Sequence, residues 1–397
     1  MHSTNHAGLE RMNASSNTRG SRDFWPVYGP TLVVWVITAG FVLVVLAFNH
    51  WDPMSFVRLG TRYGRGEPNG TIGYDGQFAY QIAVDPLGAA PYLDIRSYRY
   101  QRILYPIAAW AFALGRTSLV PWALITLNVL ALTVGTHVMG QILRRSQQNP
   151  WYALTVGLYA GQLVSLRMDL NEPLALTLAL FAIRNFDNNR HRLAAVFLAL
   201  SVLSKETSLA FVAGYLAYFL IAREWRNLRV TALVSLGPFA LLQLALWSAF
   251  GEPGLRSGGQ GATSFSLIPF GGIMALGADS VEEFFVVLII LGPVVVLPCA
   301  ALTAYLARYF LQALKQVTFR RFWRVDLSPM AIVVALHVLI MATLPLSTYS
   351  DLPGTLRLAS GLVVSTLAFG AVIRSRDVLH YAGLWISSVV LLSFPIW

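Results

Sequence analysis

Charged residues are few in this chain, and several of them lie in short turns between long apolar runs. Only 12% of the residues are charged, against about a quarter in a typical soluble domain. Carboxylates in these turns can take a proton from a hydroxyl group, and arginine or lysine can stabilise charge on a phosphate leaving group. The chemistry indicated is group transfer from a substrate with a phosphate head. The stretches are "YDGQFAYQIAVDP" (74–86), "YRYQRILYP" (98–106), "RMDLNEP" (167–173), "SKETS" (204–208) and "STYSDLPGTLR" (347–357).

Asp75 is the candidate for the catalytic base. It precedes a predicted helix, so the alternative is an N-cap that only satisfies free backbone N–H groups. The capping-box position three residues on holds Phe78 instead of Glu or Gln, which leaves the cap signal incomplete. On the predicted helix Gln77 and Gln81 share one face while Phe78 and Ile82 share another, as in a helix that lies at a membrane interface.

Four basic residues are candidates for binding a donor phosphate: Arg99, Arg102, Lys205 and Arg357. Arg99 and Arg102 are three residues apart and can share a helix face, although an interfacial belt of tyrosines and snorkelling arginines is the alternative. Lys205 is one of two lysines in a chain that otherwise uses arginine, which indicates a need for a compact ammonium group. Its alternative is a structural pair with Glu206, and that of Arg357 is an ordinary turn at a helix start.

Asp169 and Glu172 are also three residues apart, just before Pro173. They are predicted to bind the acceptor or to supply a second base, and a solvated turn with Arg167 as the ion partner is the alternative. Paired carboxylates suit Mg²⁺ or Mn²⁺, but the spacing demands no metal, and the sequence requires no cofactor. The remaining candidates for substrate binding are Tyr74, Gln77, Tyr80, Gln101, Tyr105, Glu206 and Asp351.

Apolar runs of membrane-spanning character recur along the chain, which predicts an all-α polytopic membrane protein. Residues 25–397 are predicted to form one transmembrane domain of about eleven helices, after a polar, disordered tail over 1–24. The first run is predicted to be an uncleaved signal anchor. The eleven runs are 28–49, 119–143, 150–166, 171–185, 192–204, 207–222, 228–249, 281–307, 329–347, 355–373 and 378–396.

The first outer loop, 50–118, is predicted to carry short interfacial or re-entrant helices. The run 103–115 within it is read as a helix that dips into the outer leaflet, because a full crossing would move Arg144 and Arg145 outside. If each of the eleven runs crosses once and the N-terminus is cytoplasmic, 18 of the 29 Lys and Arg residues lie in cytoplasmic segments. This bias favours the orientation with a cytoplasmic N-terminus. The Gly- and Ser-rich segment 250–272 is either a lid over the cavity or a linker.

The composition also argues against several function classes. The net charge of +10 is accounted for by the bias toward positive cytoplasmic loops, so it does not indicate nucleic-acid binding. The single cysteine, Cys299, excludes a disulfide framework, and the seven histidines show no metal-ligand spacing. No Gly-rich nucleotide motif is present, which favours a donor carried by a lipid over one carried by a nucleotide.

The motifs "YDGQFAYQIAVDP", "YRYQRILYP", "NEPLAL", "SKET" and the late "GTLR" resemble a family of bacterial membrane proteins of cell-surface glycopolymer formation. That family is similar to the GT-C glycosyltransferases, which keep a catalytic aspartate in the first outer loop. The resemblance covers about residues 28–375 and is most specific over the first 80 of them. It implies a GT-C-like bundle in the bacterial inner membrane, with the site facing the periplasm or exterior.

The same resemblance implies an inverting hexosyl- or pentosyltransferase of cell-envelope polysaccharide biosynthesis, with Asp75 as its base. A sugar would pass from a polyprenyl-phosphate donor to a glycan or lipid acceptor. The main alternative is a flippase or transporter of a lipid-linked sugar, which typically shows inverted repeats and charges reachable from both sides. The sequence shows no internal repeat, and its turn charges fall on one side. A third alternative is an inactive assembly subunit.

Overall fold

The computed structural model describes residues 6–256, 258–259, 261–315 and 327–393, and over these ranges it contains helices and no strand. The all-α prediction is therefore confirmed. Among the described residues, five helices are long and apolar enough to cross a membrane. These are Tyr28–Phe48, Thr117–Arg145, Trp225–Phe250, Val281–Lys315 and Leu352–Val372.

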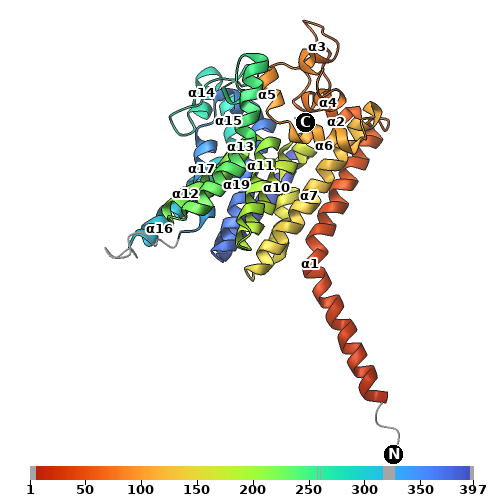
Figure 1. Cartoon of the computed structure of the whole chain (residues 1–397), viewed down its shortest axis with the longest axis vertical. Helices are drawn as coiled ribbons and strands as arrows, with labels where there is room; N and C mark the ends of the chain where they lie inside the picture. The colour runs from red at the N-terminus through yellow and green to blue at the C-terminus, as the bar shows by residue number, and fades with distance from the viewer. Residues whose placement is uncertain (1–5, 257, 260, 316–326, 394–397) are drawn as a thin grey trace, which may run out of the picture.

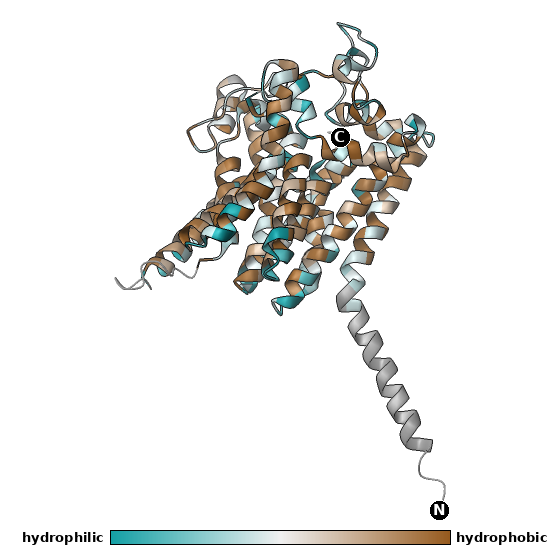
Figure 2. Cartoon of the chain, viewed as in Figure 1, coloured by the Kyte–Doolittle hydropathy of each residue, from teal (hydrophilic) through white to brown (hydrophobic). Residues whose placement is uncertain are grey.

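One side of the bundle is a row of helices that lie side by side (Figure 1). α1 (His6–Phe48) packs on α7 (Val120–Arg145), and α7 packs on α10 (Glu172–Asp187). α10 packs in turn on α11 (His191–Ser204), which contacts α13 (Trp225–Phe250). Figure 2 shows hydrophobic residues along the sides of the bundle and hydrophilic ones mainly toward the helix ends.

The other side is built around α19 (Leu352–Val372), most of whose residues are buried. α19 contacts α17 (Pro329–Ala342) and α9 (Ala160–Arg167), and α17 contacts α12 (Leu209–Ile221). A Cβ at Gly161 of α9 would lie 2.1 Å from the Leu356 carbonyl oxygen, so glycine permits the close contact between α9 and α19. The other helices on this side are α14 (Gly271–Asp279), α15 (Val281–Leu291), α16 (Leu297–Lys315), α18 (Leu346–Tyr349) and α20 (Arg376–Gly383).

The first loop folds into short helices at one end of the bundle (Figure 1). The run 103–115 becomes α6 (Leu104–Phe112), whose nine residues span about 14 Å at 1.5 Å per residue. This is shorter than a hydrocarbon core of about 30 Å, and α6 is not among the helices long enough to cross a membrane. The others are α2 (Met54–Val57), α3 (Thr61–Gly64), α4 (Gly76–Val84) and α5 (Arg96–Tyr100).

Three of the eleven runs depart from continuous helices. In run 329–347, α17 ends at Ala342 and α18 begins only at Leu346. Run 150–166 is divided into α8 (Leu154–Leu158) and α9, because Tyr159 has an extended backbone with ψ 135°. Run 378–396 consists of α20 followed by a 3₁₀ helix, Leu384–Ser393, and its residues 394–396 lie outside the described part. The count of eleven crossing helices is not confirmed.

Two other segments bear on the sequence predictions. The helix α1 begins at His6 and projects away from the bundle, through a segment whose composition indicates disorder (Figure 1). Residues 1–5 lie outside the described part, and the disorder of the tail stays a prediction.

In the segment 250–272, the Leu255 N–H donates to Gln243 Oε1 and the Thr263 N–H to Ser347 Oγ, at 3.1 and 3.0 Å. Residues 257 and 260 are not described, and the role of this segment as lid or linker also stays a prediction.

Candidate functional site

A small cavity lies where the first loop meets α10 and α19. Its volume is about 30 Å³, which holds about two water molecules. It brings together seven ionisable residues that the sequence singles out, three acids and four bases, from five separate stretches of the chain. The lining consists of Asp75, Phe78, Ala79, Ile82, Arg99, Arg102, Tyr105, Pro106, Asp169, Leu170, Asn171, Glu172, Lys205 and Arg357.

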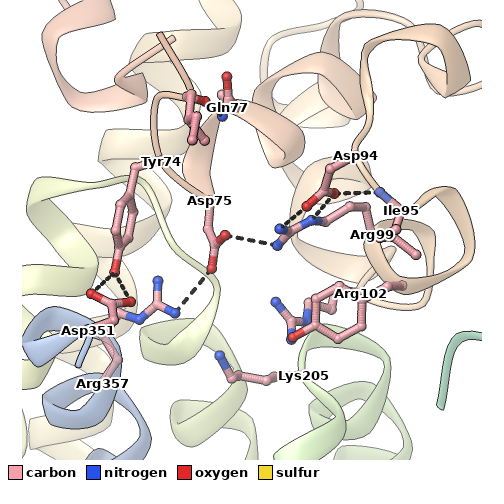
Figure 3. A network of polar contacts seen from close by, with 12 residues as sticks. Tyr74, Asp75, Gln77, Asp94, Ile95, Arg99, Arg102, Lys205, Asp351 and Arg357 are labelled. Carbon is pink, nitrogen blue, oxygen red and sulfur yellow. Dashed lines mark hydrogen bonds and ion pairs between the residues drawn. The ribbon is translucent and has the colours of Figure 1, made fainter. Parts of the chain in front are cut away.

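Asp75 lies between two arginines (Figure 3). Its Oδ1 is 3.0 Å from Arg99 Nη1, and its Oδ2 is 3.1 Å from Arg357 Nη2. Asp75 occupies the N-cap position of α4, but its side chain makes no capping hydrogen bond. Burial alone would raise its pKa, but the charges of Arg99 and Arg357 outweigh burial and hold the pKa far below its usual range. The carboxylate therefore serves as an ion-pair partner in this state, and the N-cap alternative is not observed.

Arg99 is held in place by a second carboxylate, Asp94. Asp94 accepts from Arg99 Nε and Nη2, both at 2.7 Å, and also from the backbone N–H of Ile95. The Arg99 guanidinium carbon lies 4.1 Å from the centre of the Phe78 ring. A bidentate pair and a stacked aromatic ring fix the planar guanidinium, which leaves Nη1 directed at Asp75.

Arg102 makes a separate bidentate pair on the other wall of the cavity. Its Nε and Nη2 donate to Glu206, the former at 2.8 Å, and Nη2 also donates to the Tyr98 hydroxyl. Glu206 stands 104 positions away in the chain, in the turn between α11 and α12. The alternative of a Lys205–Glu206 pair is not observed, since Glu206 binds Arg102 instead.

Lys205, Glu172 and Arg357 form the innermost group of charges. Lys205 Nζ donates to Glu172 Oε1, and both side chains are almost fully buried. Arg357 Nε lies 3.5 Å from the same oxygen, while its Nη2 reaches Asp75. Arg357 thus connects the innermost pair with Asp75, and its Nη1 is buried without a hydrogen-bond partner among the described residues.

Local backbone contacts bring these charges together. Asn171 Nδ2 donates to the Ser204 carbonyl at 2.7 Å, which joins the turn before α10 to the end of α11. Glu172 and Lys205 are the residues that directly follow these two anchors, so the hydrogen bond places them side by side. On the opposite wall, α4 begins against the turn that contains Met168 and Asp169.

Gly76, at the start of α4, permits the close contact between α4 and the turn that contains Met168. The variant Gly76→Ala is therefore expected to destabilise the site. A Cβ at residue 76 would lie 2.0 Å from the Met168 carbonyl oxygen. We expect a loss of about 1–3 kcal/mol and a lower thermal midpoint of the purified protein. Gly40→Ala in α1 is the matched control, because a Cβ there meets no atom within 4 Å. Equal midpoints for both variants would contradict the close packing of α4.

Other predicted site residues lie around the cavity, and some have structural roles. The Tyr74 hydroxyl donates to Asp351 Oδ2 at 3.0 Å, next to Arg357. The Tyr105 hydroxyl donates to the Leu124 carbonyl and accepts from Asn128. These two tyrosines therefore support the walls of the cavity.

Gln77, Tyr80 and Gln101 are not among the lining residues. Both ends of the Gln77 amide brace the first loop, since Oε1 accepts from the Gly60 N–H and Nε2 donates to the Ile72 carbonyl. Tyr80 packs against an apolar cluster, and Gln101 accepts from Gln243 at 3.4 Å. These three side chains therefore do not line the cavity that Asp75 lines.

Sequence reasoning did not single out Asp94, Tyr98 and Asn171 as site residues, although all three hold functional candidates in place. Asp94 orients Arg99, Tyr98 contacts Arg102, and Asn171 sets the Glu172–Lys205 pair. The only available signal was their position within or beside the quoted motifs. In the described part of the chain, no group of three or more His, Cys, Asp or Glu side chains is arranged to hold a metal ion.

Comparisons with protein-family models, with curated proteins and with solved structures give no match. The geometry of the cavity and the sequence motifs therefore supply the basis for a functional proposal.

Proposed function

We propose that the chain is a GT-C-type glycosyltransferase that moves a sugar from a polyprenyl-phosphate donor to a glycan or lipid acceptor. The observation that carries this proposal is the position of Asp75 between Arg99 and Arg357, within hydrogen-bond distance of both. Each oxygen of its carboxylate faces one guanidinium. Two oxygens of a phosphate group can take the same two places, because arginine binds carboxylate and phosphate with the same planar geometry.

The reaction would be a single displacement at the anomeric carbon. The acceptor oxygen bonds to that carbon, the bond from the carbon to the phosphate oxygen breaks, and polyprenyl phosphate leaves with the electron pair. The proton of the acceptor hydroxyl goes to the Asp75 carboxylate, and the anomeric centre inverts. Arg99, Arg357 and Lys205 would stabilise the charge on the leaving phosphate, and the cavity of about 30 Å³ would have to widen to admit the donor.

Phosphate binding would also change the basicity of Asp75. As long as both arginines hold the carboxylate, its pKa is low and it is a weak base. When the donor phosphate takes over Arg99 and Arg357, the two ion pairs of Asp75 are lost and its pKa rises. The base would thus become effective only when the donor is present.

The proposal places the protein in the bacterial inner membrane. The N-terminus would be cytoplasmic, about eleven segments would cross, and the cavity would face the periplasm or exterior. The asymmetric distribution of Lys and Arg between the loops supports this orientation. The five long apolar helices support the membrane environment.

The test uses purified full-length protein in lipid nanodiscs with a panel of polyprenyl-phosphate sugars and a cell-envelope glycan extract. We expect release of polyprenyl phosphate that requires both a matching donor and the acceptor. Failure of every donor to react, although a donor binds, would contradict the transferase. Movement of an intact lipid-linked sugar across vesicle membranes, without transfer, would support the transporter alternative.

A further inference from the structure

Asp169 has the most unusual environment of the three acids that line the cavity. Its side chain is fully buried, and neither carboxylate oxygen has a hydrogen-bond partner among the described residues. Its backbone has φ 48°, in the left-handed region, which aspartate adopts more readily than most residues other than glycine. Asp169 therefore lines the cavity, and no described residue forms a hydrogen bond with its carboxyl group.

The cations around Asp169 are already engaged elsewhere. Its neighbour Arg167 donates to the Ser55 carbonyl at 2.7 Å and lies over the Phe56 ring. Lys205 binds Glu172, and Arg357 binds Asp75 and Glu172. Arg99 and Arg102 have bidentate partners of their own, as described above. No described cation is thus within ion-pair distance of Asp169.

A buried carboxylate without a partner is too costly to remain ionised, so it takes up a proton. Burial accordingly raises the pKa of Asp169 well above its usual range, and the charge of Arg167 only partly opposes this effect. The contrast with Asp75 is direct: the two acids line one cavity, but two arginines lower the pKa of Asp75, whereas burial without a partner raises the pKa of Asp169.

We propose that Asp169 binds the substrate as a neutral carboxylic acid, donating one hydrogen bond to a sugar hydroxyl and accepting another. A protonated carboxyl has one O–H donor and a carbonyl acceptor, a pattern that neighbouring hydroxyl groups of a sugar can complement. The identification of the ligand as a sugar rests on the proposed function. Asp169 Oδ1 and Oδ2 have no hydrogen-bond partner among the described residues, so a sugar would supply partners for them.

Two variants separate this role from that of an ionised base or metal ligand. Asp169→Asn keeps one donor and one acceptor in nearly the same places, and asparagine tolerates a positive φ. Asp169→Gly also tolerates the positive φ but removes both hydrogen-bonding atoms. Thermal midpoints of the two variants are measured first, and Asp169→Asn is the one expected to keep the wild-type fold.

Sugar transfer and donor binding are then compared in nanodiscs. We expect Asp169→Asn to retain the affinity for a polyprenyl-phosphate sugar within about threefold, and Asp169→Gly to lose about tenfold or more, the equivalent of one or two hydrogen bonds. Affinity for polyprenyl phosphate without a sugar is expected to change little in either variant. If Asp169→Asn is as impaired as Asp169→Gly, the charge of the carboxylate is required and the proposal is wrong.

An infrared measurement tests the protonation state without any turnover. The difference spectrum between wild type and Asp169→Asn at neutral pH should contain the carbonyl stretch of a protonated carboxylic acid. Only carboxylate bands in that spectrum would overturn the proposal. If no donor reacts in the transfer assay, the proposed function fails, whereas the infrared band and the binding of the sugar-bearing lipid still decide the role of Asp169.

Discussion

Asp75→Asn is expected to lower sugar transfer by about 10²–10⁴-fold, because it removes the proton acceptor and leaves the rest of the cavity in place. The same variant is expected to bind polyprenyl phosphate more tightly than the wild type. In the wild type the carboxylate occupies Arg99 and Arg357, and an incoming phosphate has to displace it. An amide carries no charge and competes less for the two guanidinium groups.

The two effects of Asp75→Asn are measured on the same preparation, transfer by release of polyprenyl phosphate and affinity by titration of the lipid. Glu67→Gln is the control, because it removes a negative charge from an exposed side chain of the same loop. The control should leave both quantities unchanged. Transfer that survives in Asp75→Asn would remove Asp75 as the base. Weaker lipid binding in that variant would contradict its competition with phosphate for the arginines.

Glu172→Leu is expected to cause the largest loss of stability, about 3–5 kcal/mol. It leaves the Lys205 ammonium buried without its carboxylate, and an uncompensated buried charge is costly. Lys205→Met in the same protein removes that charge, so the double variant should recover most of the loss. Unfolding of the two single variants and the double variant in detergent forms the mutant cycle.

Glu282→Leu at the exposed start of α15 is the control for the cycle, and it should change stability by only about 0.5 kcal/mol. A double variant as unstable as Glu172→Leu alone would show that the pair does not account for the loss. The double variant is also expected to bind polyprenyl phosphate more weakly, since it lacks one of the four cations of the cavity.

Much of the fold follows from the apolar pattern, and the exceptions have physical reasons. Long apolar runs predict helices because each backbone group is then satisfied within its own segment. The break at Tyr159 was not predictable, because the apolar run continues through it without a proline. Close packing of α9 on α19 depends on a distant partner, Leu356, and not on local propensity. The charge of Arg144 and Arg145 predicts that the run 103–115 does not cross, and the nine residues of α6 agree with that prediction.

The sequence also indicates which charges meet, but not how they pair. Turns between apolar runs predict that Asp75, Arg357 and Lys205 lie at one end of the bundle, and the structure places all three on one cavity. The pairing of Arg102 with Glu206 depends on how helices far apart in the chain pack, so no local spacing encodes it. Gln77 shows what the sequence does not reveal: its amide braces the first loop, and its role in substrate binding stays a prediction.

The central claim is that the paired arginines around Asp75 form the binding site for a lipid-linked phosphate. The most direct measurement is a structure of the full-length protein in a nanodisc with a polyprenyl phosphate bound. We predict phosphate oxygens within hydrogen-bond distance of Arg99 and Arg357, with Asp75 released from at least one of them. A phosphate bound elsewhere, with Asp75 still bridging both arginines, would contradict the account.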